Sequence, residues 1–212
     1  MSAYIFIICV ELLAIKIRSI NSVKGISFQN ETFKILQFAD DTVLILKDVN
    51  SIKCALEVLN DFESCSGLKL NKSKTEIFRL GNSVQGAAEK LCSIGLQEVT
   101  SNFKYLGIWF DIDKKEMEYK NFRHKLENMR NLLKMWKLRD LSLKGKIVVI
   151  KSLAMSQLIY SLTLLEIPKW VIEEANSLFY DFLWDSKPDK VKRTTIIRKI
   201  EEGGLKMIDI EC

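Results

Sequence analysis

The chain has 212 residues, 48% of them hydrophobic, so it is long enough to bury one large core or two small ones. Two prolines and nine glycines argue against a low-complexity or long disordered chain. Five cysteines, with no C-x-x-C spacing, argue against a disulfide framework or a zinc site, and favour an intracellular setting in cytoplasm, nucleus or both.

Positive charge is concentrated in one segment. The whole chain has a formal net charge of +5, yet residues 114–151 hold twelve Lys and Arg against four acids. The rest of the chain is therefore slightly acidic. A basic segment of this kind is typical of proteins that bind nucleic acid, although it is also found on solvated helices and on membrane-docking helices.

The first predicted element is a helix over residues 4–17. Apolar side chains fill nearly every face, and Glu11 and Lys16 are the polar exceptions, which predicts a helix buried on most sides. The segment has no basic region before it and is too short to span a bilayer, so a signal peptide or membrane anchor is the weaker interpretation.

Short strands follow. We expect strands at 25–29, 33–39 and 42–46, with one turn at Asn30-Glu31 and another at Asp40-Asp41. A helix should then begin at an N-cap formed by Asn50 or Ser51 and end at Gly67. Its apolar positions stand at helical spacing: Ile52, Leu56, Leu59 and Phe62.

The next segments are less regular. Residues 69–80 are typical of a loop that enters a strand, and residues 81–100 are a weakly patterned connection. Residues 103–112 (FKYLGIWFDI) predict one or two further strands.

From about residue 115 the pattern becomes helical and basic. An apolar stripe predicts an amphipathic helix, Ser142 can cap a second helix over 141–162, and a third is expected over 170–184 before the basic segment 187–199. The fold class is therefore α+β: a strand-rich part over 1–113 and a helical part over 114–212. The stripe consists of Phe122, Leu126, Met129, Leu133 and Trp136.

The adjacent carboxylates Asp40 and Asp41 stand between two apolar runs, in ILQFADDTVLIL. An ordinary hairpin turn is one explanation, since Asp tolerates turn geometry. A rigid metal site is the other explanation. The pair lacks the Gly that tight hairpins prefer, and its apolar flanks suggest a turn anchored in a core. Mg²⁺ usually takes one or two protein carboxylates plus substrate phosphates.

A site for two metal ions needs a further carboxylate from another strand. No other acid in the sequence stands in a comparable apolar frame, so the set of ligands is incomplete within this chain. The candidates considered are Glu11, Asp48, Asp111 and Asp113.

Several segments together resemble one family. Phe38-Ala39-Asp40-Asp41 is similar to the Phe/Tyr-Ala-Asp-Asp signature of reverse transcriptases, specifically those of LINE-type non-LTR retrotransposons. The agreement continues in order along nearly the whole chain, through SAYIFIICVELLAIKIR, SGLKLNKSKTE, FKYLGI, LSLKGKIVVIKSLAMSQLIY, FLWDSKP and GGLKMID.

The resemblance implies roles for individual residues. Asp40 would be a Mg²⁺ ligand of the polymerase palm, with Asp41 beside it as a weaker or supporting ligand. Lys74 would stand near the departing pyrophosphate, although it could equally be a solvated loop lysine. Phe38 would contact the nucleotide or primer end, unless it is a core residue. Tyr105, Leu106 and Gly107 would form a hairpin that supports the primer, while core packing explains Leu106 equally well.

The implied function is part of an RNA-directed DNA polymerase that acts on an RNA template, a DNA primer and deoxynucleoside triphosphates, with Mg²⁺ as cofactor. Residues 1–113 would be a partial palm and residues 114–212 a basic thumb that grips the duplex. The family's first palm aspartate is absent, so we expect a fragment that does not polymerise alone. A non-enzymatic nucleic-acid-binding remnant and an unrelated structural protein are the alternatives.

Partners other than nucleic acid and nucleotides are not indicated. Trp136 lies on the apolar stripe, which favours packing against protein over a membrane surface, and we expect no membrane partner. Stacking of Trp109, Trp136, Trp170 or Trp184 on bases is possible in principle, but their spacing favours core packing. His124, the single histidine, is given no catalytic role, and the sequence does not indicate an oligomeric state.

Overall fold

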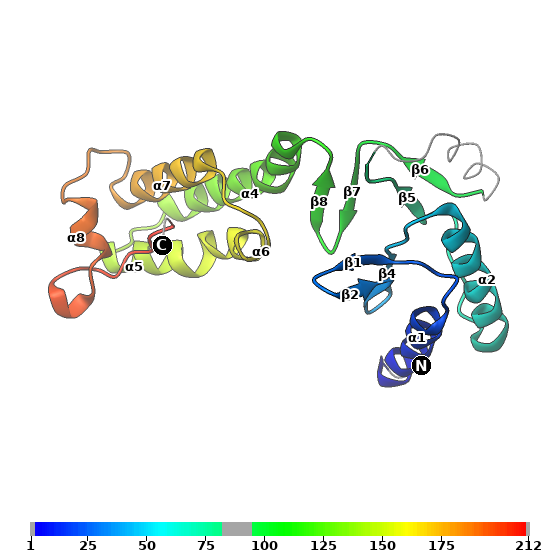
Figure 1. Cartoon of the computed structure of the whole chain (residues 1–212). Coiled ribbons are helices and arrows are strands. Elements are labelled where there is room, and N and C mark those ends of the chain that lie inside the picture. Colours follow the sequence, from blue (N-terminus) through cyan, green and yellow to red (C-terminus); the bar gives the residue numbers. More distant parts are fainter. Residues whose placement is uncertain (1–2, 82–94, 211–212) are drawn as a thin grey trace. The chain divides into compact units, whose positions relative to one another are not determined.

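The computed structural model describes residues 3–81 and 95–210. The chain divides into two compact units, Met1–Asn102 and Phe103–Cys212, each with its own hydrophobic core. Figure 1 shows the order of the elements, and each unit is described here by itself. Most of the connection expected over residues 81–100, together with Cys92 and Cys212, lies outside the described residues.

The first unit combines two helices with short strand pairs. Helices α1 (Ala3–Ser19) and α2 (Val49–Ser66) pack against each other, and α1 also packs against the strand at residues 35–38. Strands β1 (Ile26–Phe28) and β2 (Glu31–Phe33) form one antiparallel hairpin, and β3 (Ile35–Phe38) and β4 (Asp41–Leu44) form another. The third pair, β5 (Glu76–Phe78) and β6 (Gln97–Val99), is parallel.

Two turns lie one residue earlier than the sequence predicted. The β1–β2 turn is formed by Gln29 and Asn30, both with positive φ, and Glu31 already belongs to β2. Two positive φ angles are the feature of a type I′ turn, whose twist matches that of the flanking strands. Lys34 interrupts the strand expected over 33–39, so β2 and β3 belong to different hairpins.

Helix α2 ends at the predicted residue but begins earlier than predicted. Asp48, and not Asn50 or Ser51, is the N-cap, and its carboxylate accepts the Ser51 N–H at 2.7 Å. Gly67 has φ 72° and donates its N–H to the Glu63 carbonyl, as expected of a left-handed C-cap. The buried residues of α2 are Ser51, Ala55 and Val58, and Leu59 and Phe62 pack at the edge of the core.

Helix α1 forms as predicted, but the expectation that it is buried on most sides is wrong. Only Leu13, Ala14 and Ile17 are buried. The unit offers the helix a single face, formed by α2 and β3, so the remaining apolar side chains are exposed. These exposed residues are Tyr4, Ile5, Ile7, Ile8, Leu12 and Ile15.

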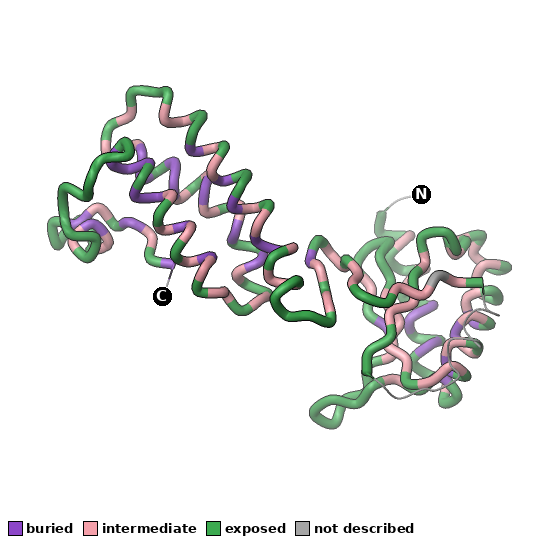
Figure 2. Tube along the Cα trace, turned by 90° about the horizontal axis from the view of Figure 1, so that it is seen from above, coloured by how far each residue is buried: buried purple, intermediate pink, exposed green. Residues whose placement is uncertain are grey.

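The second unit consists of one hairpin and a helical bundle. Strands β7 (Asn102–Tyr105) and β8 (Ile108–Asp111) precede α4 (Lys114–Lys137), which packs against α6 (Ser156–Leu164) and α7 (Lys169–Leu183). The short elements α8 (Arg193–Ile197) and η2 (Ile200–Glu202) follow. Figure 2 shows buried positions repeated along the helices of this unit.

The apolar stripe predicted on α4 forms the centre of this larger core. Phe122, Leu126, Met129 and Leu133 are at most 3% exposed, and Trp136 packs at the margin. They meet Phe179 and Leu183 of α7, which are also buried. A spacing of three and four residues places such side chains on one face of a helix, which explains the success of the prediction.

The single helix predicted over residues 141–162 is divided into three. Ser142 caps α5 (Leu143–Val149) as predicted, and its hydroxyl accepts the Gly145 N–H at 3.2 Å. A π-helical segment, η1 (Ile150–Ala154), follows α5, and the axis bends by 48° between Ala154 and Ser156, where α6 begins.

No single helix within the described residues has the length and apolarity to cross a membrane, whereas this bent pair passes the same test by length and composition. Several of its apolar residues belong to the core of the unit, including Ile147, Ile150, Ala154 and Leu158. The prediction of an α+β fold is confirmed: helices and short strand pairs, with most helices after residue 113.

Candidate functional site

The two aspartates lie at the tip of the β3–β4 hairpin. Phe38 pairs with Asp41 across the hairpin, so Ala39 and Asp40 form the two-residue turn and Asp41 begins β4. The turn predicted at Asp40-Asp41 is therefore one residue too late. Ala39 has φ 53°, which supplies the positive φ that a tight hairpin requires without a glycine.

The tip of this hairpin is exposed, which corrects the expectation of a turn anchored in a core. Only Ile35, at the far end of β3, is buried, while Phe38 is 65% exposed. Asp40 and Asp41 are both exposed. Within the described residues neither carboxylate has a hydrogen bond or an ion pair to another protein group, so both can bind a ligand from solvent.

The other acids considered as metal ligands are engaged elsewhere. Glu11 pairs with Arg18 at 2.9 Å, and Asp48 caps α2. The Lys120 ammonium, 2.7 Å away, holds the pKa of the Asp111 carboxyl below its usual value, as does the Asp113 N–H. Asp113 caps α4 by accepting the Lys115 N–H at 2.9 Å.

Across residues 3–81 and 95–210, no three His, Cys, Asp or Glu side chains are grouped in a way that could hold a metal ion. The donors at the hairpin nevertheless suit a hard cation. Mg²⁺ takes one or two carboxylates and completes its shell with water and substrate phosphates, and Asp40 and Asp41 offer free oxygens. They do not by themselves complete a site for two ions.

Lys74 lies in the same unit, on the turn before β5. Its N–H is donated to the Asn71 carbonyl at 3.1 Å, and its side chain is exposed. In the part of the chain that is described, its ammonium forms no ion pair with Asp40 or Asp41.

Tyr105, Leu106 and Gly107 belong to the second unit, in the β7–β8 hairpin. Leu106 and Gly107 form its turn, with φ 47° and 81°. The turn is attached to α6, because the Tyr160 hydroxyl donates to the Leu106 carbonyl at 2.5 Å. Substitution of Gly107 would place a Cβ 3.8 Å from the Tyr160 ring.

Asn121 of α4 clamps the second strand of this hairpin. Its side chain accepts the Trp109 N–H at 2.9 Å and donates to the Trp109 carbonyl at 2.7 Å and to the Met117 carbonyl at 2.8 Å. At 2% exposure it is among the few buried polar residues described. Sequence reasoning missed both Asn121 and Tyr160. An Asn beside the apolar stripe was a weak signal, since only the fold reveals its partner.

The tryptophans follow the prediction of packing in three cases. Trp184 is buried, and Trp136 and Trp170 pack against the core. Trp109 differs, because the ammonium groups of Lys104 and Lys120 lie 5.5 and 5.9 Å from its ring centroid.

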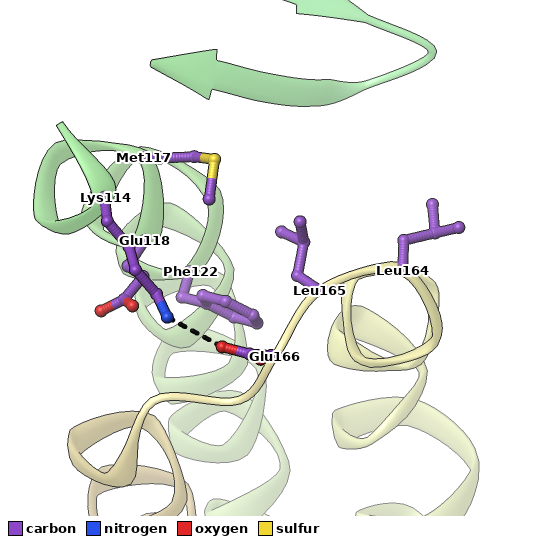
Figure 3. A pocket seen from close by; sticks show the side chains of 7 residues that line it. All are labelled: Lys114, Met117, Glu118, Phe122, Leu164, Leu165 and Glu166. Carbon is purple, nitrogen blue, oxygen red and sulfur yellow. Dashed lines mark hydrogen bonds and ion pairs between the residues drawn. The ribbon is translucent and has the colours of Figure 1, made fainter. Parts of the chain in front are cut away.

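A small pocket of about 290 Å³ lies in the second unit, between the start of α4 and the segment after α6. Figure 3 shows Met117, Phe122 and Leu165 around it, with the Lys114–Glu166 ion pair of 2.8 Å at its edge. The lysine is neutralised by its partner, and the lining is otherwise mainly apolar. The pocket therefore offers little chemistry.

An exposed hairpin that presents Phe-Ala-Asp-Asp, followed in sequence by a helix and further strands, agrees with the family that the sequence resembles. A family model described as Reverse transcriptase (RNA-dependent DNA polymerase) matches residues 1–110, just over half of the chain. The chain belongs to this family. The match includes the β3–β4 hairpin, Lys74 and the β7–β8 turn.

Proposed function

We propose that the chain is a piece of a LINE-type non-LTR retrotransposon reverse transcriptase, comprising part of the palm and a basic thumb. The observation that carries the proposal is the exposed Asp40-Asp41 pair, free of partners among the described residues, in a chain of the reverse transcriptase family. Asp40 would ligate Mg²⁺, and Asp41 would support it from the start of β4.

The substrates proposed are an RNA template, a DNA primer and deoxynucleoside triphosphates. Bound Mg²⁺ would neutralise phosphate charge and assist attack of the primer 3′-hydroxyl on the α-phosphorus. Exposed Phe38 can stack on a base or sugar beside the carboxylates. Lys74 can offset the charge of the departing pyrophosphate, and the Tyr105–Gly107 hairpin can support the primer.

We further propose that the chain does not polymerise alone. A two-metal reaction needs a carboxylate beyond Asp40 and Asp41, and the other acids considered are committed to caps and ion pairs. A longer copy of the element, acting as a separate polypeptide, would have to contribute it.

Primer extension tests both parts of the proposal. The purified chain, with an RNA template annealed to a DNA primer, Mg²⁺ and all four deoxynucleotides, should give no product. When the upstream palm and fingers of a related element are supplied as a second polypeptide, Mg²⁺-dependent incorporation should appear. Asp40→Ala should abolish that product, whereas Glu201→Ala, which removes another exposed acid, should leave it unchanged.

Incorporation by the isolated chain that is lost in Asp40→Ala would overturn the claim of inactivity and support the role of Asp40. A second candidate function is that of a non-enzymatic nucleic-acid-binding remnant. It is favoured by the observation that, among the described residues, no third carboxylate groups with the Asp40-Asp41 pair. That candidate predicts duplex binding with no incorporation even after the upstream region is supplied.

A further inference from the structure

Among the lysines of the second unit that have no acidic partner within the described residues, two are associated with the β7–β8 hairpin. Lys104 lies on β7 and Lys125 on α4, and within the described residues neither has a carboxylate within ion-pair distance. Other lysines of the same helix are neutralised: Lys114 by Glu166, and Lys120 by Asp111. Their uncompensated charge therefore distinguishes Lys104 and Lys125 from Lys114 and Lys120.

The hydrogen bond at the hairpin turn links these two lysines to one tyrosine. Lys104 stands two residues before Leu106, whose carbonyl accepts the Tyr160 hydroxyl. Lys125 lies over the ring of the same tyrosine, with its ammonium 5.8 Å from the ring centroid, and donates to the hydroxyl of the buried Ser161. Tyr160 thus contacts both the hairpin turn and the lysine on α4.

The arrangement is electrostatically unfavourable in the absence of an anion. Partial burial lowers the pKa of the Lys125 ammonium below its usual value, and the charge of Lys104 lowers it further. An anion placed between the two ammonium groups would relieve both effects, because it replaces lost solvation and screens their repulsion.

We infer that Lys104 and Lys125 form a binding site for one backbone phosphodiester of a nucleic acid, with Tyr160 as the residue that positions the hairpin beside it. A phosphodiester has the charge and the acceptor oxygens that two lysines can contact. The inference rests on the proposed function, since it assigns a contact within the same nucleic-acid complex.

The test uses the full chain and a fluorescein-labelled 20-base-pair RNA–DNA duplex without divalent metal, with binding followed by anisotropy at several salt concentrations. Lys104→Gln and Lys125→Gln should each weaken binding about tenfold near 0.1 M salt and reduce the slope of log K against log salt by up to about 1, the contribution of one phosphate. Lys125→Arg, which keeps the charge, should retain both affinity and slope.

Lys114→Gln is the matched control, since it removes the same charge from the same helix at a neutralised position. It should change affinity less than twofold. If Lys104→Gln and Lys125→Gln behave like Lys114→Gln while the unmodified chain binds the duplex, the phosphate site is wrong and the proposed function stands. If the unmodified chain shows no salt-dependent binding, the nucleic-acid function itself fails and the inference falls with it.

Discussion

The two tight hairpins of this protein, β3–β4 in the first unit and β7–β8 in the second, solve the same geometric problem in opposite ways. Each turns in two residues, and each needs a positive φ: 53° at Ala39 in one, 47° and 81° at Leu106 and Gly107 in the other. The first hairpin ends in exposed carboxylates that have no partner among residues 3–81 and 95–210. The second is held at its turn by a side chain of α6 and at its second strand by a side chain of α4.

The difference separates a hairpin that is available for ligand binding, β3–β4, from a hairpin that contributes to stability, β7–β8. A hairpin whose tip has no side-chain partner contributes little to stability, yet its polar groups stay available to solvent and ligands. A hairpin held by side-chain hydrogen bonds from neighbouring helices moves with the helices that hold it. The β7–β8 hairpin accordingly belongs to the helical unit, and its turn residues are fixed relative to α4 and α6.

Among these predictions, Asn121→Ala should have the largest effect on stability, because it removes the clamp on the β7–β8 hairpin. It removes three hydrogen bonds from a side chain that is 2% exposed and leaves the Trp109 backbone groups without their partners. We expect a loss of about 3 kcal/mol in the unfolding free energy of the second unit. All four tryptophans lie in that unit, so urea denaturation followed by tryptophan fluorescence measures it directly.

Asn128→Ala is the control, because Asn128 is an exposed asparagine on the same helix, and its contact is with His124. Its unfolding free energy should change by less than about 0.5 kcal/mol. Equal effects of the two substitutions would show that the clamp does not stabilise the hairpin.

The two turns should respond in opposite directions to exchange of Gly and Ala. Gly107→Ala forces a side chain into positive φ and should destabilise the second unit by about 1.5 kcal/mol. Ala39→Gly removes that strain at the cost of chain entropy and should stabilise the first hairpin by about 0.5 kcal/mol. Tryptophan fluorescence measures the stability change caused by Gly107→Ala, and amide hydrogen exchange in β3 and β4 measures the change caused by Ala39→Gly. Stability changes of the same sign would contradict the comparison.

Asp48→Ala should weaken α2 by about 1 kcal/mol, measured by hydrogen exchange of its amides. Hydrogen bonds from the Ser51 N–H and hydroxyl lower the pKa of Asp48 below its usual value of 3.8. The stabilisation is therefore fully present above about pH 4 and is lost as pH falls through the lowered pKa. A difference between Asp48→Ala and the unmodified chain that persisted in strong acid would contradict this assignment.

The sequence predicted those elements whose signals are local. The stripe on α4, the Ser142 cap and the Gly67 C-cap follow from spacing and cap chemistry, and all three are confirmed. The burial of α1 was predicted wrongly, because an apolar composition does not say how many faces the fold provides. The turns were displaced by one residue, because Ala39 and Gln29 adopt positive φ without the glycine that marks such positions.

The candidate site was predictable only in part. The resemblance selected Asp40 and Asp41, and the family is confirmed, but the metal-binding role stays a prediction. The exposure of the hairpin tip contradicts the prediction, made from the apolar flanking residues, that the turn is anchored in a core. The large side chain of Phe38, for example, points into solvent. The contacts of Asn121, Tyr160 and Lys125 depend on residues 12 to 54 positions away, which no local pattern encodes.

Paramagnetic broadening by Mn²⁺ in amide NMR spectra of the full chain tests the availability of the Asp40-Asp41 pair most directly, with Mn²⁺ standing for Mg²⁺ as an oxygen-binding cation. The matched comparison is Glu201-Glu202, another adjacent and exposed pair of acids. At substoichiometric Mn²⁺, signals of residues 38–42 should broaden first, and Asp40→Asn with Asp41→Asn should abolish that broadening. Equal broadening at Glu201-Glu202, or broadening of 38–42 that survives the double substitution, would contradict a cation site at the hairpin.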